Sequence, residues 1–296
     1  MNAKQTAGSW FLATRPQTLW ASASPVIIGT ALAYRDGGFH LSSALAALCG
    51  ALLIQIGTNF ANDYFDTQNK IDQPGSHEPI RITQGTLLPA ATIRLAFTLV
   101  FLAVLPFAYF LTLRAGLPIL FLGIISIFFG FFYSAGPRPF SHLGLGDILV
   151  LVFFGPVAVG ATYYCQALTI NGTVFLAGLS CGFLSTAIMV VNNLRDIKTD
   201  RLAGKITLAV RYGERFTRYE YVFCLLAASA VVPLLMVLSK DGSFLKLIPA
   251  AFIFACIPLI HDLHMSKTPE DLNMVLSATG QVLSVFTLLF SILWIL

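Results

Sequence analysis

The stretch VNNLRDIKTDRLAGKITLAVRYG, residues Val191–Gly213, decides what kind of protein this is. It directly follows the apolar run Val174–Val191, which is long enough to be a membrane span. Within it Asn192, Asp196 and Asp200 stand four residues apart, so a helix would carry all three on one face. The amide and carboxylate oxygens of these residues suit Mg²⁺, a hard cation that often binds through a few carboxylates and substrate phosphates. Basic residues that could hold the phosphates follow: Arg201, Lys205 and Arg211.

The composition is that of an integral membrane protein. Of the 296 residues, 56% are hydrophobic and only 11% are charged, whereas a soluble domain carries about 25% charged residues. The mean hydropathy is +0.79. The net charge of +4 is small and indicates no nucleic-acid partner. The five cysteines form no Cys-x-x-Cys pair, so we expect reduced thiols rather than disulfides or a zinc site.

Apolar runs of the length that crosses a bilayer recur along the chain. We expect an all-α, polytopic fold of about nine transmembrane helices in a single domain, residues 1–296, with no cleavable signal peptide. The predicted spans are Pro16–Tyr34, Leu41–Phe60, Leu95–Leu113, Leu117–Tyr133, Ile148–Cys165, Val174–Val191, Val222–Leu238, Leu245–Ile260 and Leu276–Leu296.

The charges divide unequally between the two sides that nine spans create. One side holds 14 of the 18 Lys and Arg residues, and the other holds only Arg35, Arg114, Lys240 and Lys246. The positive-inside rule places the richer side in the cytoplasm. The acidic residues follow the same division, so we expect the chemistry at the cytoplasmic face of the cytoplasmic membrane.

A second group of Asn and Asp residues follows the second predicted span, in Asn59–Gly85. Asn62 and Asp66 are four residues apart, as are Asn59 and Asp63. Further candidates come later in this stretch and in the Gly/Pro-rich connection after the fourth span: Asp72, Arg81, Tyr133, Ser134 and Arg138. Because both Asn/Asp groups follow even-numbered spans, we expect them to face each other across a cavity.

Each signal alone has a simpler interpretation. A single Asp-x-x-x-Asp in a loop is more often a solvated surface or a helix cap. Lys205 and Arg138 could serve only membrane topology or anionic lipid. Two matched Asn/Asp groups on one side of a membrane are harder to explain this way, because ionisable groups close to lipid are costly.

Taken together, these motifs resemble the UbiA superfamily of intramembrane prenyltransferases. NDYFD at Asn62–Asp66 is similar to the first Asp-rich motif of the family, and NNLRDIKTDRLAGKITLAVRYG at Asn192–Gly213 is similar to the second. RPQTL at Arg15–Leu19, IRITQG at Ile80–Gly85 and GPRPFSHLGLGD at Gly136–Asp147 point to the branch that acts on 1,4-dihydroxy-2-naphthoate in menaquinone biosynthesis. The last two predicted spans carry no motif.

The resemblance implies a Mg²⁺-dependent transfer of a polyprenyl group from its diphosphate to the naphthoate ring, with loss of CO₂. It implies a metal site formed by Asn62, Asp66, Asp72, Asn192, Asp196 and Asp200. It implies catalytic roles for Asn62, Asp63, Asp66, Asp196 and Asp200. It implies diphosphate binding by Lys205, Arg138, Tyr133 and Arg81. Many members have a third acid four residues after the position of Asp66; here that residue is Lys70, and Asp72 follows two residues later.

Two alternatives stay open at this point. Another aromatic acceptor would leave the same motifs in place, because acceptor contacts are not readable from the sequence. A transporter that uses membrane carboxylates is a different class, but transporters usually place such groups near the middle of the bilayer. The sequence does not indicate the length of the prenyl chain or the oligomeric state.

Overall fold

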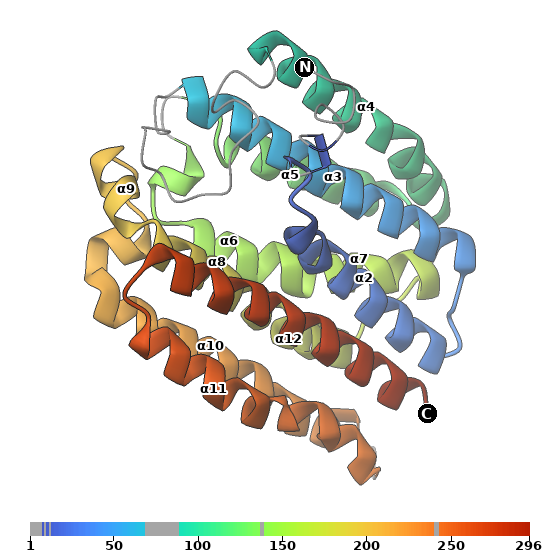
Figure 1. The fold of residues 1–296 in the computed structure, drawn as a ribbon. Helices are drawn as coiled ribbons and strands as arrows, with labels where there is room; N and C mark the ends of the chain where they lie inside the picture. Colours follow the sequence, from blue (N-terminus) through green and yellow to red (C-terminus); the bar gives the residue numbers. More distant parts are fainter. Residues whose placement is uncertain (1–7, 9, 12, 69–88, 137–138, 240–242) are drawn as a thin grey trace.

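In the computed structural model the chain is almost entirely helical. The structure describes residues 8, 10–11, 13–68, 89–136, 139–239 and 243–296, and no strand occurs among them. Its long helices lie side by side (Figure 1). The α-helices are α2 (Pro16–Arg35), α3 (Leu41–Gln68), α4 (Ala90–Ala115), α5 (Leu117–Phe132), α6 (Gly146–Val152), α7 (Ala158–Ala167), α8 (Gly172–Arg195), α9 (Ile197–Leu202), α10 (Leu208–Ser239), α11 (Phe252–Met265) and α12 (Pro269–Ile295). The 3₁₀-helices η1 (Phe140–His142) and η3 (Phe244–Ala251) and the π-helix η2 (Phe153–Val157) complete the set.

Every predicted span falls on a helical segment, and the all-α membrane fold is confirmed. In the part of the chain that the structure describes, seven segments are long and apolar enough to cross a membrane, and α5 is a shorter apolar helix. The remaining predicted span is α2, which has 20 residues but carries polar side chains in its first half. That half lines a cavity rather than lipid. The count of nine is therefore approximate.

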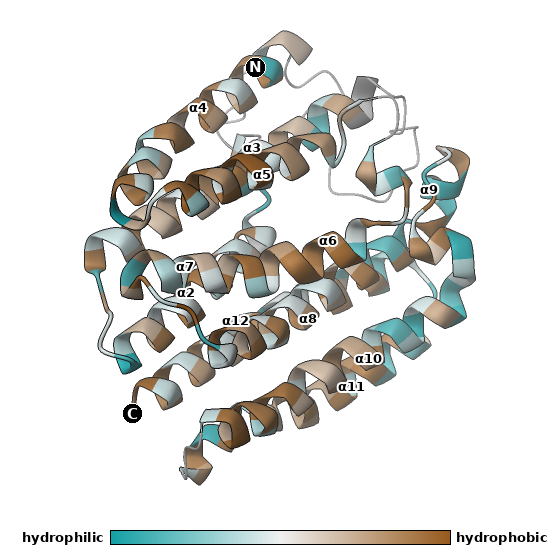
Figure 2. Ribbon diagram, turned by 180° about the vertical axis from the view of Figure 1, so that it is seen from behind, coloured by the Kyte–Doolittle hydropathy of each residue, from teal (hydrophilic) through white to brown (hydrophobic). Residues whose placement is uncertain are grey.

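Two helices extend well beyond their predicted ends. α3 continues past Phe60 to Gln68, so the first Asp-rich motif is helical. α10 begins at Leu208 instead of Val222 and is bent at Gly213, where φ is 85°. Both extensions are rich in polar residues, and an apolar run marks only the part of a helix that lies in lipid. Figure 2 shows hydrophilic residues gathered around α9 and the start of α10, with hydrophobic residues along the rest of α10 and along α11.

Buried apolar side chains form one large core and smaller ones. The large core joins α2, α7, α8, α10, α11 and α12 and contains Leu184, Leu225 and Phe286, all fully buried. A smaller core around Ile93 and Phe97 joins α4 to the end of α3 and to α5. α2 packs against α12 and also contacts α3, so it lies between the two sets of helices (Figure 1). This division leaves space between the large core and the α3–α5 layer.

Candidate active site

A cavity of about 900 Å³ lies in that space. Residues from α2, α3, α5, α6, η2, α8 and α12 line it. On α3 the lining runs from Ala51 to Asn62, which corresponds to about 16 Å along a helix. Much of the wall is apolar: Trp20, Ile54, Phe129, Phe153, Phe154, Ile188 and Leu276. Charged and polar side chains gather where the two Asn/Asp motifs meet it: Arg15, Asn62, Tyr133, Ser134, Asn192 and Lys205.

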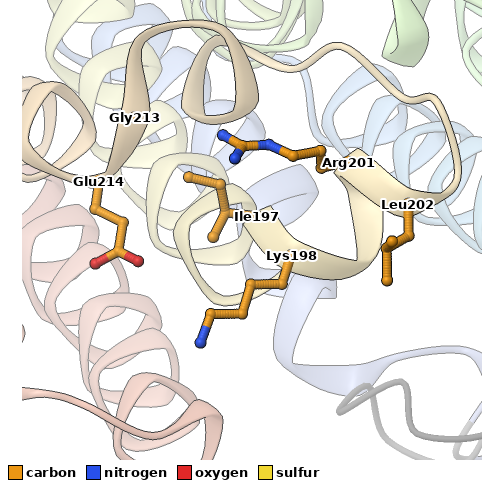
Figure 3. A pocket seen from close by; sticks show the side chains of 6 residues that line it. All are labelled: Ile197, Lys198, Arg201, Leu202, Gly213 and Glu214. Carbon is orange, nitrogen blue, oxygen red and sulfur yellow. The ribbon is translucent and has the colours of Figure 1, made fainter.

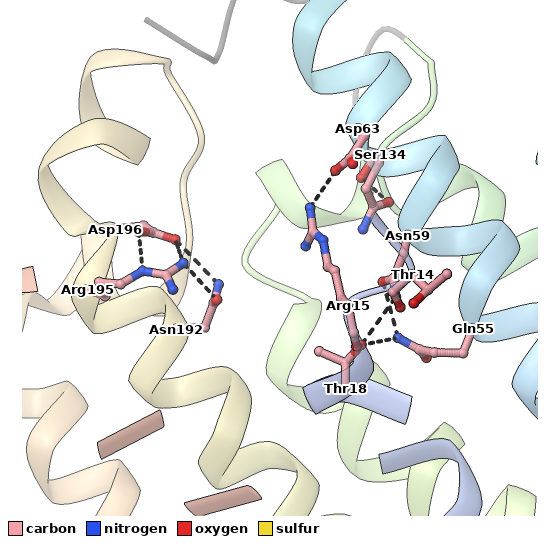
Figure 4. Close-up of polar contacts among 11 residues, drawn as sticks. Thr14, Arg15, Thr18, Gln55, Asn59, Asp63, Ser134, Asn192, Arg195 and Asp196 are labelled. Atoms are coloured by element: carbon pink, nitrogen blue, oxygen red, sulfur yellow. Dashed lines mark hydrogen bonds and ion pairs between the residues drawn. The ribbon is translucent and has the colours of Figure 1, made fainter. Parts of the chain in front are cut away.

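The first motif meets the cavity at the end of α3. The Ser134 hydroxyl donates to Oδ1 of Asn62 at 2.6 Å. Asp63 is buried, and its Oδ1 accepts from Nη2 of Arg15 at 2.7 Å. Figure 4 shows Arg15, Asp63 and Ser134 on one side and Asn192, Arg195 and Asp196 on the other. Because Asn62 and Asn192 line the same cavity, the two motifs do face each other across it.

Arg15 is a site residue that sequence reasoning missed, because it was noted only as part of the stretch that opens the first span. It precedes α2 with a left-handed backbone, φ 50° and ψ 67°, which is unfavourable for a residue with a Cβ. Several contacts hold it there. The side chain forms the ion pair with Asp63, and the Arg15 carbonyl accepts from the backbone N–H and the hydroxyl of Thr18. The Asn59 amide also donates to the neighbouring carbonyl of Thr14 at 2.9 Å. Non-glycine strain of this kind often occurs at functional sites.

The second motif is not one continuous helix, which corrects the sequence prediction. α8 ends at Arg195, Asp196 lies at the junction with φ −95° and ψ 5°, and α9 begins at Ile197. The backbone N–H of Asp196 still donates to Asn192 at 3.1 Å, and that of Asp200 donates to Asp196 at 2.8 Å. These bonds keep the helical spacing through the break, so the motif residues still follow one another turn by turn.

Arg195 holds the polar side chains of the second motif in place through hydrogen bonds. Its Nε and Nη2 donate to the two carboxylate oxygens of Asp196 at 2.8 and 2.6 Å. Nη2 also donates to Oδ1 of Asn192 at 2.9 Å, and Nη1 donates to Oδ1 of Asn273 on α12 at 2.8 Å. Arg195 and Asp196 are both buried. A bidentate guanidinium fixes the carboxylate plane, so the orientation of Asp196 is set before any ligand binds.

Lys205 lies just beyond α9 and reaches the cavity. Its ammonium donates to Oδ1 of Asp200 at 3.1 Å, and its backbone N–H donates to the carbonyl of Asp200 at 2.9 Å. A turn containing Gly204, with φ 73°, places it there. Tyr133 also lines the cavity, with its hydroxyl 3.7 Å from the sulfur of Met189.

Four sequence candidates cannot be placed in this way. The side chain of Asp66 and the residues Asp72, Arg81 and Arg138 lie outside the described part of the structure. Their roles stay predictions.

Arg201 lies elsewhere than the sequence suggested. It lines a second, smaller pocket of about 350 Å³ between α9 and the start of α10, with Lys198 and Glu214 (Figure 3). Its Nη2 donates to the carbonyl of Val210 at 3.4 Å. Arg201 lines this smaller pocket and not the large cavity. Asp196 and Asp200 do not line the large cavity either, but their side chains bond Asn192 and Lys205, which do line it.

The donors at the cavity fit Mg²⁺ shared with a substrate. Among the described residues, no three His, Cys, Asp or Glu side chains form a cluster that would enclose a metal. Mg²⁺ rarely uses such a cage and is usually held by one or two carboxylates together with substrate phosphates. Asn192 lines the cavity and carries an amide oxygen, and Asp196 supplies a carboxylate one helical turn later. A carboxylate oxygen can accept more than one contact.

Comparison with known proteins identifies the family. The UbiA prenyltransferase family model matches residues 22–278. The chain belongs to the UbiA prenyltransferase family. It is therefore a prenyltransferase enzyme, and we no longer consider the transporter interpretation.

Curated relatives of this UbiA prenyltransferase are similar over most of their length. A 1,4-dihydroxy-2-naphthoate octaprenyltransferase from Escherichia coli is 40% identical over 75% of this chain and 74% of its own. The Haemophilus influenzae enzyme of the same name is 33% identical over 96% and 94%. The Mycobacterium tuberculosis one is 34% identical over 94% of both chains.

Solved structures share the fold of this UbiA prenyltransferase. A digeranylgeranylglyceryl phosphate synthase has a TM-score of 0.66 at 16% identity, covering 98% of this chain and 99% of the other. A UbiA homologue from Archaeoglobus fulgidus bound to DMAPP and Mg²⁺ has a TM-score of 0.64 at 13% identity, covering 96% and 98%. At these identities the likeness concerns the fold.

Proposed function

We propose that this enzyme transfers a polyprenyl group from polyprenyl diphosphate to 1,4-dihydroxy-2-naphthoate, with Mg²⁺ as cofactor and CO₂ as a product. The resulting compound is demethylmenaquinone, an intermediate of menaquinone biosynthesis. The observation that carries the proposal is the identity of 33–34% with two named naphthoate octaprenyltransferases along nearly the whole chain. The cavity supports it, because two oxygen-rich motifs and cations meet beside an apolar chamber.

The side chains at the motif end of the cavity suit a diphosphate. Lys205 and Arg15 bring positive charge to the cavity, and the Tyr133 and Ser134 hydroxyls can donate hydrogen bonds. When bound, Mg²⁺ would supply positive charge that neutralises the leaving diphosphate. Asn62, Asn192, Asp196 and Asp200, with Asp66 and Asp72 from the undescribed part of the first motif, are the residues that we propose to hold it. Asp63 we assign to positioning Arg15, through the ion pair that joins them.

The apolar wall serves the other half of the reaction. An allylic diphosphate that loses its leaving group becomes strongly electrophilic at the terminal carbon, and water would capture it. Phe129, Phe153 and Ile188 line the cavity with side chains that exclude water. The ring carbon that bears the carboxylate then forms the new C–C bond. The C–C bond to CO₂ breaks, and its electron pair restores the aromatic ring.

Charge distribution supports a cytoplasmic orientation of the site. The predicted cytoplasmic side carries 14 of the 18 Lys and Arg residues, and all described site residues lie at that end. We propose that the enzyme acts from the cytoplasmic face, as one domain over residues 1–296 that lies in the bilayer and binds a polyprenyl diphosphate and an aromatic acid.

The product assay tests the function directly. Purified enzyme with Mg²⁺, a long prenyl diphosphate and 1,4-dihydroxy-2-naphthoate is expected to yield a prenylated product whose mass reflects loss of CO₂. EDTA is expected to abolish the product, and excess Mg²⁺ to restore it. Product formed only with another aromatic acid would contradict the acceptor and retain the family chemistry. Undiminished turnover in EDTA would contradict the metal dependence.

Lys205→Gln is expected to lower kcat/KM for the prenyl diphosphate about 100-fold. The ammonium charge is lost beside both the cavity and Asp200, and single electrostatic groups of this kind contribute about 10²–10³ in rate. Lys205→Arg should recover part of the activity, because it keeps the charge. The control is Lys267→Gln, which removes an exposed lysine before α12. Equal activity of Lys205→Gln and the control would exclude a role for Lys205 at the diphosphate.

A further inference from the structure

The wall of the cavity beside the second motif contains a buried pair that the diphosphate site does not use. Asp147, at the start of α6, and Asn193, on α8, are each about 4% exposed. Nδ2 of Asn193 lies 3.2 and 3.4 Å from the two carboxylate oxygens of Asp147. Asn193 lines the cavity, and Asp147 lies behind it.

The pair fixes which way the Asn193 amide points. A carboxylate only accepts hydrogen bonds, so it selects the NH₂ end of the amide. The amide oxygen must then face away from Asp147. Among the described residues, none donates a hydrogen bond to the Asn193 amide oxygen. The Asn193 side chain borders the cavity. An oriented acceptor without a protein partner is therefore presented to whatever occupies this part of the cavity.

The polarity of this acceptor excludes the diphosphate as its ligand. A diphosphate carries only acceptor oxygens and negative charge, and the Asn193 oxygen backed by the Asp147 carboxylate would repel it. A ring hydroxyl has the opposite polarity and can donate to the amide oxygen. Asn193 is also adjacent in sequence to Asn192, so a ring bound to it would lie next to the proposed diphosphate site.

We propose that Asn193 accepts a hydrogen bond from a ring hydroxyl of the aromatic acceptor, and that Asp147 is the positioning residue that orients the Asn193 amide. This inference rests on the proposed function and names the contact by which the same site selects a hydroxylated ring. A hydroxyl that donates to an amide oxygen retains more electron density on its own oxygen and on the ring. The contact therefore both places the ring and favours its attack on the prenyl carbon.

The test compares two acceptors within each protein preparation. We measure kcat/KM for 1,4-dihydroxy-2-naphthoate and for its mono-methyl ethers, which keep the ring and the carboxylate but lose one hydroxyl donor each. The wild type should prefer the dihydroxy compound over one of the ethers by about 10- to 100-fold, the range for a buried hydrogen bond left unmade. The ratio does not depend on the fraction of active protein, so partial misfolding of a variant does not affect it.

Asn193→Ala and Asp147→Leu are expected to reduce this preference to within about threefold of unity, because leucine at position 147 offers the Asn193 amide no acceptor. Binding of a non-reactive prenyl thiodiphosphate should stay within about threefold of wild type in both. Ser180→Ala is the control, because its hydroxyl donates to the Ala228 carbonyl from the same helix α8 and does not border the cavity. It should keep the full preference.

Two outcomes would overturn the inference, and neither is the failure of the proposed function. If the wild type prenylates the dihydroxy compound and Asn193→Ala keeps the wild-type preference, Asn193 does not accept from the ring. If Asn193→Ala loses the preference but Asp147→Leu keeps it, Asp147 does not position the amide. The proposed function itself fails only if the wild type does not prenylate 1,4-dihydroxy-2-naphthoate at all.

Discussion

Asp196→Asn is expected to lower prenyl transfer by about 10²–10³-fold without preventing folding. The change keeps the shape of the side chain and one oxygen, but it removes the negative charge that would hold a divalent cation beside the diphosphate. Arg195 loses its anion, yet it still donates to Asn273 on α12 and to Asn192. These two contacts keep the buried guanidinium partnered, so we expect the protein to insert and fold with reduced stability.

The experiment separates metal binding from folding. Binding of a prenyl thiodiphosphate is measured with and without Mg²⁺. Wild-type protein should bind more tightly with Mg²⁺, and Asp196→Asn should show little dependence on it. Asp262→Asn is the matched control, because it is the same change at an exposed acid on α11. Asp66→Asn, in the first motif, is expected to behave like Asp196→Asn. Full turnover by a folded Asp196→Asn protein would refute the metal site.

The sequence predicted the features that depend on residues close together in the chain. Membrane spans are continuous apolar runs, so their approximate number and the apolar part of each could be read from the sequence, but the polar extensions of α3 and α10 could not. The break at Asp196 could not be predicted from the spacing, because four-residue periodicity persists when a helix bends and its i to i+4 bonds survive. Asn192 still lines the cavity, and Asp196 and Asp200 are bonded to the cavity-lining residues Asn192 and Lys205, so the break in the helix does not separate the motif from the cavity.

Contacts between distant residues were beyond sequence reasoning. Arg15 and Asp63 are 48 residues apart, and Asp147 and Asn193 are 46 apart. Neither pair leaves a periodic signal. A cation directly before the first span or an Asp after a Gly-rich turn has many other interpretations, and only the fold selects among them. The close approach of α8 to the bent helix around η2 is another contact between distant residues that the sequence does not reveal.

Gly182→Ala is expected to destabilise the fold by about 3 kcal/mol or more. A Cβ at Gly182 would collide with the carbonyl oxygen of Leu151 and would lie 3.1 Å from Cα of Gly155. Both neighbours are backbone atoms, which cannot move aside as a flexible side chain can. Gly155 itself has non-helical φ −108° and ψ −115° inside η2, and a Cβ there would lie 2.7 Å from the carbonyl oxygen of Gly178.

The spacing of Gly178 and Gly182 gives the physical reason for this sensitivity. Two small residues four apart let membrane helices approach closely enough for backbone packing, which is a main source of helix association in lipid. α8 also carries Asn192 and Asn193 at its other end, so a shift of α8 away from α6 would move both from their positions at the cavity. Loss of stability and loss of activity should therefore accompany each other.

A matched glycine elsewhere separates packing from helix propensity. Gly123, in the middle of α5, has open space where its Cβ would lie. Gly123→Ala should be neutral or slightly stabilising, because alanine favours the helix by up to about 1 kcal/mol over glycine. The fraction of monodisperse protein remaining after heating in detergent gives an apparent melting temperature for each variant. It should fall by on the order of 10 °C for Gly182→Ala and not for Gly123→Ala. Equal melting temperatures for the two variants would mean that α8 and the bent helix can move apart without loss of stability. That result would contradict the importance of the contacts at Leu151 and Gly155.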